Sequence, residues 1–395
     1  MKSLDAPSLK PTVYQERCSM VRFSGAHCDR CLAGCPTDSI RITYPALTID
    51  DTCSGCGFCA ALCPNEVFSF PGESPMRFTN DEEKPDPLYC SGLLVTGPMP
   101  AGVLPPSVIP CLGSISTAFI LARVLLDEKP LEVVTGSCDE CPMKAGENGY
   151  RQREGGIQSL FDYLRIGFSP ARVSTGSAAE RRDVSRQYEV FRVGVEESKA
   201  LSRRDFFRHL RGSVATHRPQ PARNNANDAR TSDVESRHRR PTEESRSLVE
   251  IFRKYAGGVT GEKGAVPGFT EIQVDEKCSG CGSCTSLCPT GALTFDEGPA
   301  AVQLEWTAAH CSHCNLCFDV CARKALHVSP CLDAGRIAGE TTSIIKVFQR
   351  HLCQECGNSF LSSGSAACCS DCSKAENLME ALSMMIYGEE RRAAR

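Results

Sequence analysis

The 395-residue sequence lacks an apolar run that could cross a membrane. A membrane-spanning helix needs about 20 consecutive apolar residues. The longest candidate, from Ile115 to Leu126, is shorter and contains Arg123. The opening residues, MKSLDAPSLKPTVYQER, also lack the apolar core of a signal peptide. We therefore expect a cytoplasmic protein without a membrane span.

The sequence also lacks a strong charge of one sign and the common catalytic motifs. Its net charge is −4 and its pI about 6.1, so no basic field indicates nucleic-acid binding. No G-x-G-x-x-G follows a strand-like run, and the chain contains neither a P-loop nor G-x-S-x-G. These absences argue against nucleotide-dependent and serine-hydrolase chemistry.

Cysteine is abundant instead, with 26 residues, which is far more than packing requires. Disulfides, zinc and iron–sulfur clusters are the three explanations. Disulfide scaffolds are mostly short secreted chains, so a chain of this length without a leader favours the two metal explanations. The cysteines form four groups, within residues 18–63, 90–141, 278–331 and 353–372.

A cysteine-free stretch separates the second group from the third. Its centre, THRPQPARNNANDARTSDVESRHRRPTEESR, offers almost no apolar surface to bury and predicts a disordered linker. A short helix before it is indicated by the capping-box residues Ser202 and Asp205 and by Gly212.

An internal repeat organises the cysteines. Four segments place a β-prone run before clustered cysteines and a second β-prone run after them. They begin near Val13, Ala46, Thr270 and Ala301. Each pair of segments predicts one pseudo-twofold α+β unit, which is too small for a large apolar core. Bound metal must then supply much of its folding energy.

The third group contains C-x2-C-x2-C-x3-C-P, the run with which bacterial ferredoxins hold four-iron clusters. The run comprises Cys278, Cys281, Cys284 and Cys288 before Pro289, and Cys311, Cys314, Cys317 and Cys321 repeat it before Ala322. In such runs the fourth cysteine serves the other cluster. Cluster three thus takes Cys278, Cys281, Cys284 and Cys321, and cluster four takes Cys311, Cys314, Cys317 and Cys288. The alternative is a pair of zinc knuckles, which normally use separated C-x2-C pairs.

The first group has one regular and one irregular half. Cys53, Cys56, Cys59 and Cys63 repeat the full motif, whereas Cys18, Cys28, Cys31 and Cys35 begin with a nine-residue spacing. The same logic assigns Cys18, Cys28, Cys31 and Cys63 to cluster one, and Cys53, Cys56, Cys59 and Cys35 to cluster two. Without Cys18 as a ligand, a three-iron cluster or a missing site is the alternative.

Both regions resemble the bacterial two-cluster ferredoxins, through these runs and the Cys-Pro steps at 35–36, 63–64 and 288–289. The resemblance covers about a third of the chain. It implies one-electron transfer without substrate chemistry of its own.

The middle region predicts a β-α-β unit, with strands at 108–110 and 131–135 and a helix over 114–126. Cys111 and Cys138 would follow the carboxyl ends of parallel strands, where open α/β sheets place ligands. Residues 86–200 resemble the small iron–sulfur (delta) subunit of methyl-viologen-reducing hydrogenases, through Ile109 to Gly113, Thr135 to Cys138, Glu147 to Tyr150, Leu164 to Gly167 and Pro170 to Val173. The resemblance implies a two-iron cluster on Cys90, Cys111, Cys138 and Cys141. Reduced, inert thiols in an α/β domain are the alternative.

Two C-x2-C pairs near the C-terminus have the layout of a zinc ribbon. They are Cys353 with Cys356 and Cys369 with Cys372; Cys368 competes with Cys369. A helix from about Lys374 to Tyr387 would follow. Cys331 fits no site and is expected as a free thiol. His310 and His313 beside Cys311 are expected to be exposed, although either could donate to a cluster sulfur.

The expected fold comprises two α+β ferredoxin-like domains, a central α/β parallel-sheet domain and a C-terminal zinc-ribbon-like segment. The domain ranges are 1–80, 86–200, 266–335 and 345–395, with a helix and linker at 201–265. We expect a wiring subunit of an anaerobic oxidoreductase of the hydrogenase, formate dehydrogenase or heterodisulfide reductase kind, with a catalytic subunit and a second electron carrier as partners. The alternatives are a redox enzyme using the middle-domain cysteines and a cluster-stabilised redox-sensing interaction module.

Overall fold

The computed structural model describes residues 10–70, 87–93, 107–139, 141, 143–186, 239–258, 263–298, 301–329, 332–369 and 371–373. The predicted helix near Ser202, most of the predicted linker, Cys331 and the predicted helix from Lys374 lie outside these ranges. Within them, no helix combines the length and the apolar character that a membrane crossing requires.

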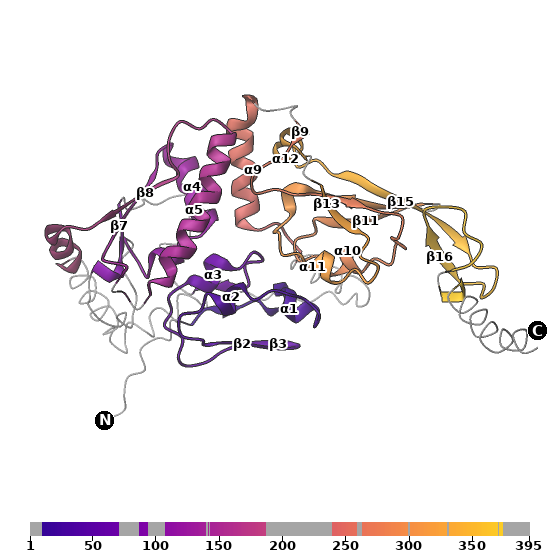
Figure 1. Cartoon of the computed structure of the whole chain (residues 1–395), viewed down its shortest axis with the longest axis horizontal. Helices are drawn as coiled ribbons and strands as arrows, with labels where there is room; N and C mark the ends of the chain where they lie inside the picture. The colour runs from indigo at the N-terminus through magenta and orange to yellow at the C-terminus, as the bar shows by residue number, and fades with distance from the viewer. Residues whose placement is uncertain are drawn as a thin grey trace, which may run out of the picture.

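The N-terminal unit consists of two short antiparallel ribbons joined by small helices (Figure 1). Its outer strands, β1 (Thr12–Val13) and β4 (Phe68–Ser69), pair with each other, and its inner strands, β2 (Ile40–Thr43) and β3 (Ala46–Ile49), form a hairpin. Its helices are η1 (Gln15–Arg17), α1 (Ser19–Arg22), α2 (Arg30–Ala33) and α3 (Phe58–Leu62). The cysteines lie on or beside these helices.

The C-terminal unit repeats this pairing scheme. Its outer strands, β10 (Glu271–Val274) and β13 (Leu326–Ser329), pair antiparallel, as do its inner strands, β11 (Leu293–Glu297) and β12 (Ala301–Trp306). Its helices are α10 (Ser283–Leu287), η5 (Ala308–His310) and α11 (Leu316–Asp319). In both units, strands lie at the β-prone runs that flank the cysteines.

The inner sheet of the C-terminal unit continues into the C-terminal segment. β15 (Ser343–Leu352) pairs with β12 and also with β16 (Ser359–Ser362), which gives the order β11-β12-β15-β16. The small ribbon of β9 (Lys263–Gly264) and β14 (Leu332–Asp333) and the helix α12 (Ala334–Ala338) flank this sheet. The zinc-ribbon-like segment is therefore an extension of this sheet, and it projects from one end of the molecule (Figure 1).

The middle region contains a parallel sheet of order β6-β5-β7-β8. Its strands are β5 (Leu88–Cys90), β6 (Val108–Ile109), β7 (Leu131–Thr135) and β8 (Ala171–Thr175), with η2 (Ser91–Leu93), η3 (Leu112–Ser114), α4 (Thr117–Asp127), α5 (Ala145–Tyr163) and a helical stretch at 178–186. The expected neighbours β6 and β7 are separated by β5. The expected helix at 114–126 begins later, because 112–114 form a 3-10 turn and Ser116 caps α4 by accepting from the Phe119 amide.

Helix α9 (Glu243–Tyr255) differs from the linker predicted for this segment. Thr242 caps it by accepting from the Ser245 amide, and Glu243 and Glu244 occupy its first turn, where carboxylates are favoured. Leu248, Val249, Ile251 and Phe252 are buried. The start of α9 was not predicted because it lies in the last residues of the polar string. Only these residues fold together with the apolar run that follows.

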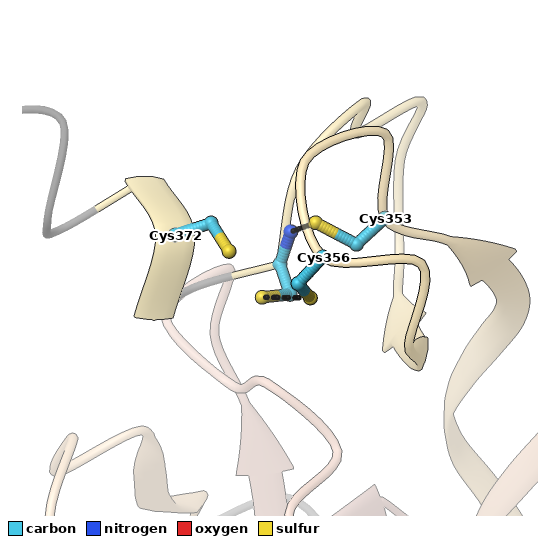
Figure 2. Close-up of side chains that lie close together, drawn as sticks. Cys353, Cys356 and Cys372 are labelled. Carbon is cyan, nitrogen blue, oxygen red and sulfur yellow. Dashed lines mark hydrogen bonds between the residues drawn. The ribbon is translucent and has the colours of Figure 1, made fainter.

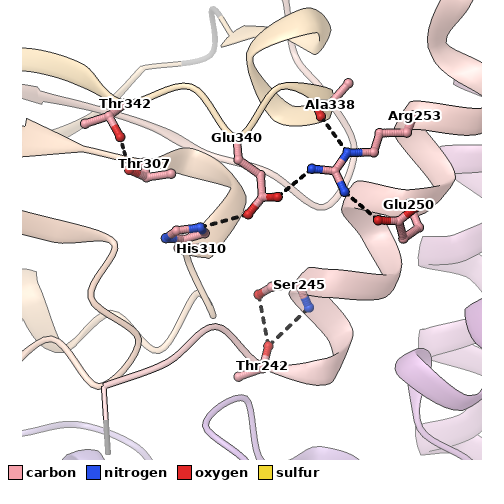
Figure 3. Close-up of polar contacts among 9 residues, drawn as sticks. All are labelled: Thr242, Ser245, Glu250, Arg253, Thr307, His310, Ala338, Glu340 and Thr342. Atoms are coloured by element: carbon pink, nitrogen blue, oxygen red, sulfur yellow. Dashed lines mark hydrogen bonds and ion pairs between the residues drawn. The ribbon is translucent and has the colours of Figure 1, made fainter. Parts of the chain in front are cut away.

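Helix α9 joins the middle region to the C-terminal unit. Lys254 forms a 2.5 Å ion pair with Glu128 after α4, while Arg253 donates to Ala338 O at 3.0 Å and pairs with Glu340 at 2.6 Å (Figure 3). The main apolar core also connects these regions. It contains Phe58, the buried residues of α4, α5 and α9, and those of the strands around Trp306.

Candidate metal centres

Three cysteine runs share two left-handed residues that coil the loop between their ligands. These pairs are Gly55 with Gly57, Gly280 with Gly282, and His313 with Asn315, with φ from +54° to +82°. Glycine adopts this conformation without steric cost, and Asn tolerates it better than most residues. In the irregular run, Asp29 has φ −116° instead. The loop around Cys28 and Cys31 is therefore built differently.

All four segments end in a similar turn. The third residue after the last cysteine of each run is left-handed, namely Asp38, Glu66, Gly291 and Lys324, with φ from +49° to +72°. This turn leads the chain from the last ligand into the following strand. The irregular segment therefore shares the end of the motif although it lacks its beginning.

We number the thiol sets one to four like their predicted clusters. In set three, burial and the neighbouring thiols Cys278, Cys281 and Cys321 raise the pKa of Cys284 to about 12. Burial, Cys281 and Cys321 likewise raise the pKa of Cys278. The structure therefore brings Cys321, from the later run, beside the three thiols of the earlier one.

In set four, the fourth thiol comes from the earlier run. Burial and the thiols of Cys311, Cys314 and Cys288 raise the pKa of Cys317. All four thiols also line one cavity of about 70 Å³, whose walls include Ile272, Leu293, Trp306 and Leu316. Four thiols around a small, mostly apolar space fit a metal cluster, because metal binding removes the thiol protons and the positive metal centre offsets the repulsion between thiolates.

Set one includes the uncertain ligand Cys18. Burial and the neighbours Cys63, Cys18 and Cys28 raise the pKa of Cys31 to about 12. Cys18 is 8% exposed and is packed in the same apolar core as Cys31. The stretched spacing therefore does not keep Cys18 away from the other three thiols.

Set two combines Cys35 with the regular run. Burial raises the pKa of Cys56, and Cys35 and Cys53 add to this shift. Burial, Cys56, Cys53 and then Cys31 of set one raise the pKa of Cys59. Similarly, Cys284 of set three contributes to the raised pKa of Cys317 in set four. In each unit the two sets are thus within electrostatic reach of each other.

Hydroxyl groups beside the last cysteines are functional candidates that the sequence analysis missed. The Ser39 amide donates to Cys35 Sγ at 3.4 Å, and the hydroxyls of Ser39 and Thr37 lie 3.4 and 3.7 Å from the same sulfur. Burial raises the pKa of Cys35, but these hydrogen bonds outweigh it and lower the pKa. A Ser or Thr two or four residues after the last cysteine was the available signal.

The middle-region thiols gather at the carboxyl edge of the parallel sheet. Cys90 ends β5, Cys111 follows β6 and Cys138 follows β7. A hydrogen bond with Cys111 lowers the pKa of Cys90 to about 7, and burial, Glu147, Cys90 and Cys141 raise that of Cys138 to about 11. The structure therefore brings the four predicted ligands together.

The four C-terminal thiols are closer still. The sulfurs of Cys353, Cys356, Cys369 and Cys372 all lie within 4.8 Å of one another (Figure 2). Four thiolates about 2.3 Å from one zinc ion lie roughly 4 Å apart, so this set fits a single ion. Backbone hydrogen bonds from Cys356 and Cys369 lower the pKa of Cys353 to about 6. Cys369, not its neighbour Cys368, belongs to this set.

The two histidines differ from the exposed loop residues that were expected. Both are partly buried. His310 Nε2 lies 3.0 Å from Glu340 Oε2, and His313 Nδ1 lies 3.1 Å from Thr270 Oγ1. These side chains therefore hold neighbouring segments together, while the His313 amide donates to Cys311 Sγ at 3.4 Å.

Comparisons with known proteins identify part of this arrangement. Residues 277–325 match the family model of the 4Fe-4S dicluster domain. An uncharacterized ferredoxin of Methanocaldococcus jannaschii is 35% identical over 57 residues, which are 14% of this chain and 74% of the ferredoxin. The coenzyme F420-dependent sulfite reductase of the same organism is 44% identical over 55 residues, which are 14% of this chain and only 8% of the reductase. No solved structure matches the chain. The chain therefore belongs to the 4Fe-4S ferredoxin family.

Proposed function

We propose that the chain is an electron-wiring subunit that carries four 4Fe-4S clusters, one on each of sets one to four. Cys90, Cys111, Cys138 and Cys141 would hold a two-iron cluster, and Cys353, Cys356, Cys369 and Cys372 a structural zinc ion. The partners would be a catalytic oxidoreductase subunit of an anaerobic complex and a second electron carrier. The reducing cytoplasm suits such thiol-held clusters.

The crossed grouping of the thiols supports this proposal most strongly. In each ferredoxin-like unit, the last cysteine of one run joins the first three of the other. This is the exchange that two-cluster ferredoxins use. Two clusters so arranged can accept and release single electrons, and hydrogen bonds to their sulfurs and their burial set the potentials.

Replacement of the crossed ligands tests the proposal. Cys288→Ala should damage cluster four, although Cys288 belongs to the run of cluster three, and Cys321→Ala should damage cluster three. Electron paramagnetic resonance of the reduced proteins should show one altered cubane in each variant. Electron transfer to the partner enzyme should slow, while that enzyme keeps its activity with a direct artificial dye.

Two outcomes would contradict the assignment. Damage to the cluster of the same run would refute the crossed ligation. A damaged cluster with an unchanged transfer rate would refute the wiring role of this unit. Turnover of a small substrate by the isolated protein would instead favour a redox enzyme, and clusters that never change oxidation state at physiological potentials would favour an interaction module.

A further inference from the structure

We propose that the loop from Ser19 to His27 is an internal docking element that couples the two ferredoxin-like units electronically. Through it, the thiol sets would form one relay in the order middle site, set two, set one and C-terminal unit. This inference rests on the proposed electron-transfer function and assigns a role to the irregular spacing between Cys18 and Cys28.

The loop contacts the C-terminal unit through Arg22. Its Nε donates to Leu287 O at 2.9 Å and its Nη2 to Ser286 O at 3.1 Å, while its Nη1 donates to Glu16 O of its own unit at 2.7 Å. Ser286 and Leu287 directly precede the set-four ligand Cys288. One guanidinium therefore joins the start of the loop to a ligand-bearing segment of the other unit.

The end of the loop makes a second contact. The His27 amide donates to Asp319 Oδ2 at 2.9 Å, and His27 Nδ1 lies 3.1 Å from Asp319 Oδ1. His27 directly precedes Cys28, and Asp319 lies midway between Cys317 and Cys321. This contact thus bridges residues beside ligands of set one and of both C-terminal sets.

An apolar contact fills the space between these polar ones. Ala26 is 5% exposed and packs with Leu316 and Val320 of the C-terminal unit. Cys284 and Cys314, ligands of sets three and four, lie against this cluster. Water is thereby excluded from the contact of Ala26 with Leu316 and Val320.

Asn65 supplies a further link beside the set-one ligand Cys63. It is 2% exposed. The side-chain nitrogen Nδ2 donates to Ser19 Oγ at 3.1 Å, and the side-chain oxygen Oδ1 accepts from Ser312 Oγ at 2.6 Å. Ser312 directly follows Cys311. Set one is therefore the side of the N-terminal unit that meets the C-terminal unit.

Set two faces the middle region instead. A Cβ atom on Gly57, which directly follows Cys56, would lie 2.9 Å from Ser114 Cβ of the middle region. A Cβ atom on Gly146 would lie 2.2 Å from Phe58 Cζ and 2.9 Å from Cys111 Sγ, so glycine permits a very close approach there. Since electron tunnelling weakens steeply with distance, we infer the order of the relay from which sets lie beside these contacts.

Asp319→Ala tests the docking role because it removes the partner of His27 without touching a ligand or the loop itself. Asp296→Ala is the matched control, since Asp296 is an exposed aspartate of the same unit. Hydrogen exchange should show the His27 amide exchanging roughly tenfold faster or more in Asp319→Ala only, because a hydrogen bond to a charged acceptor is lost. Ala26→Arg, which places a charge in the buried contact, should open the contact further.

Magnetic resonance of the reduced protein supplies the second measurement. Coupling between clusters of different units should weaken in Asp319→Ala and Ala26→Arg, while coupling within each unit and the iron content stay unchanged. Unchanged His27 exchange, or faster exchange with unchanged coupling between units, would overturn the proposal. Loss of set-one iron in Asp319→Ala would also overturn it, because the loop would then only hold the cluster. Wild-type protein without iron–sulfur signals would instead refute the proposed function itself.

Discussion

The contact between Phe58 and Gly146 gives a prediction whose size follows from the geometry. Phe58 is 3% exposed, and a Cβ atom on Gly146 would lie 2.2 and 2.8 Å from two of its ring carbons. Real Cβ atoms do not approach so closely, so Gly146→Ala must displace the ring. Overpacking of this kind costs about 1–3 kcal/mol.

Gly155 in the same helix α5 is the matched control. A Cβ atom there would meet nothing within 4 Å. Gly155→Ala should therefore stabilise α5 by about 0.8–1 kcal/mol, because alanine has the higher helix propensity. The same substitution in one helix should thus have opposite signs at the two positions.

Native-state hydrogen exchange of α3 provides the assay, since it reports local opening without requiring all regions to unfold together. The Ala60 and Ala61 amides both donate to Gly57 O at 3.2 Å. In Gly146→Ala they should exchange roughly five- to 150-fold faster, which corresponds to about 1–3 kcal/mol. In Gly155→Ala they should be unchanged.

A double-mutant cycle tests whether the cost of Gly146→Ala comes from its contact with Phe58. Phe58→Ala alone should cost about 3–5 kcal/mol, because a buried ring is lost. In that background Gly146→Ala should cost less by about 1 kcal/mol or more, since only the approach to Cys111 remains tight. Additive effects of the two changes would refute the reasoning, as would equal effects of alanine at positions 146 and 155.

Three further predictions concern the metal centres. Anaerobically purified protein should contain about sixteen iron atoms, or about eighteen if the middle site holds a two-iron cluster, and elemental analysis near eight would remove one ferredoxin-like unit. About one zinc should persist per chain after oxygen destroys the clusters and should be lost in Cys356→Ser, because zinc has no redox chemistry; zinc retained in that variant would contradict the C-terminal site. Ser39→Ala should make the potential of cluster two more negative in a redox titration, because it removes a hydrogen-bond donor that stabilises the reduced cluster. Thr48→Ala, on the exposed face of β3, should leave this potential unchanged. A shift of the potential to a more positive value in Ser39→Ala would contradict the role of Ser39.

The strands and the regular ligand runs could be predicted because their information is local. Alternating β-prone residues flank each run, and Gly55, Gly57, Gly280 and Gly282 occupy positions where the loop needs left-handed backbone. In a regular run, the spacing of the first three ligands fixes their convergence within a few residues. The fourth ligand comes from the other run of the unit, and its assignment followed from the motif.

The parts that differed depend on contacts between distant segments. β5 has three residues, too few to reveal that it inserts between β6 and β7. Helix α9 starts within the end of a polar string, and its contacts are with distant residues, such as Glu128 directly after α4 and Ala338 of α12. Composition averaged over the string could not show this.

The irregular spacing before Cys28 illustrates the same limit in the metal site itself. From the sequence, the nine-residue spacing only weakened Cys18 as a ligand. In the structure, Ala26 and the His27 amide of this loop contact Leu316, Val320 and Asp319, almost three hundred residues later. A regular two-residue spacing would have no position for Arg22, whose guanidinium donates to Leu287 O and Ser286 O of the C-terminal unit. The departure from the motif is therefore better explained by the neighbouring unit than by the loss of a ligand.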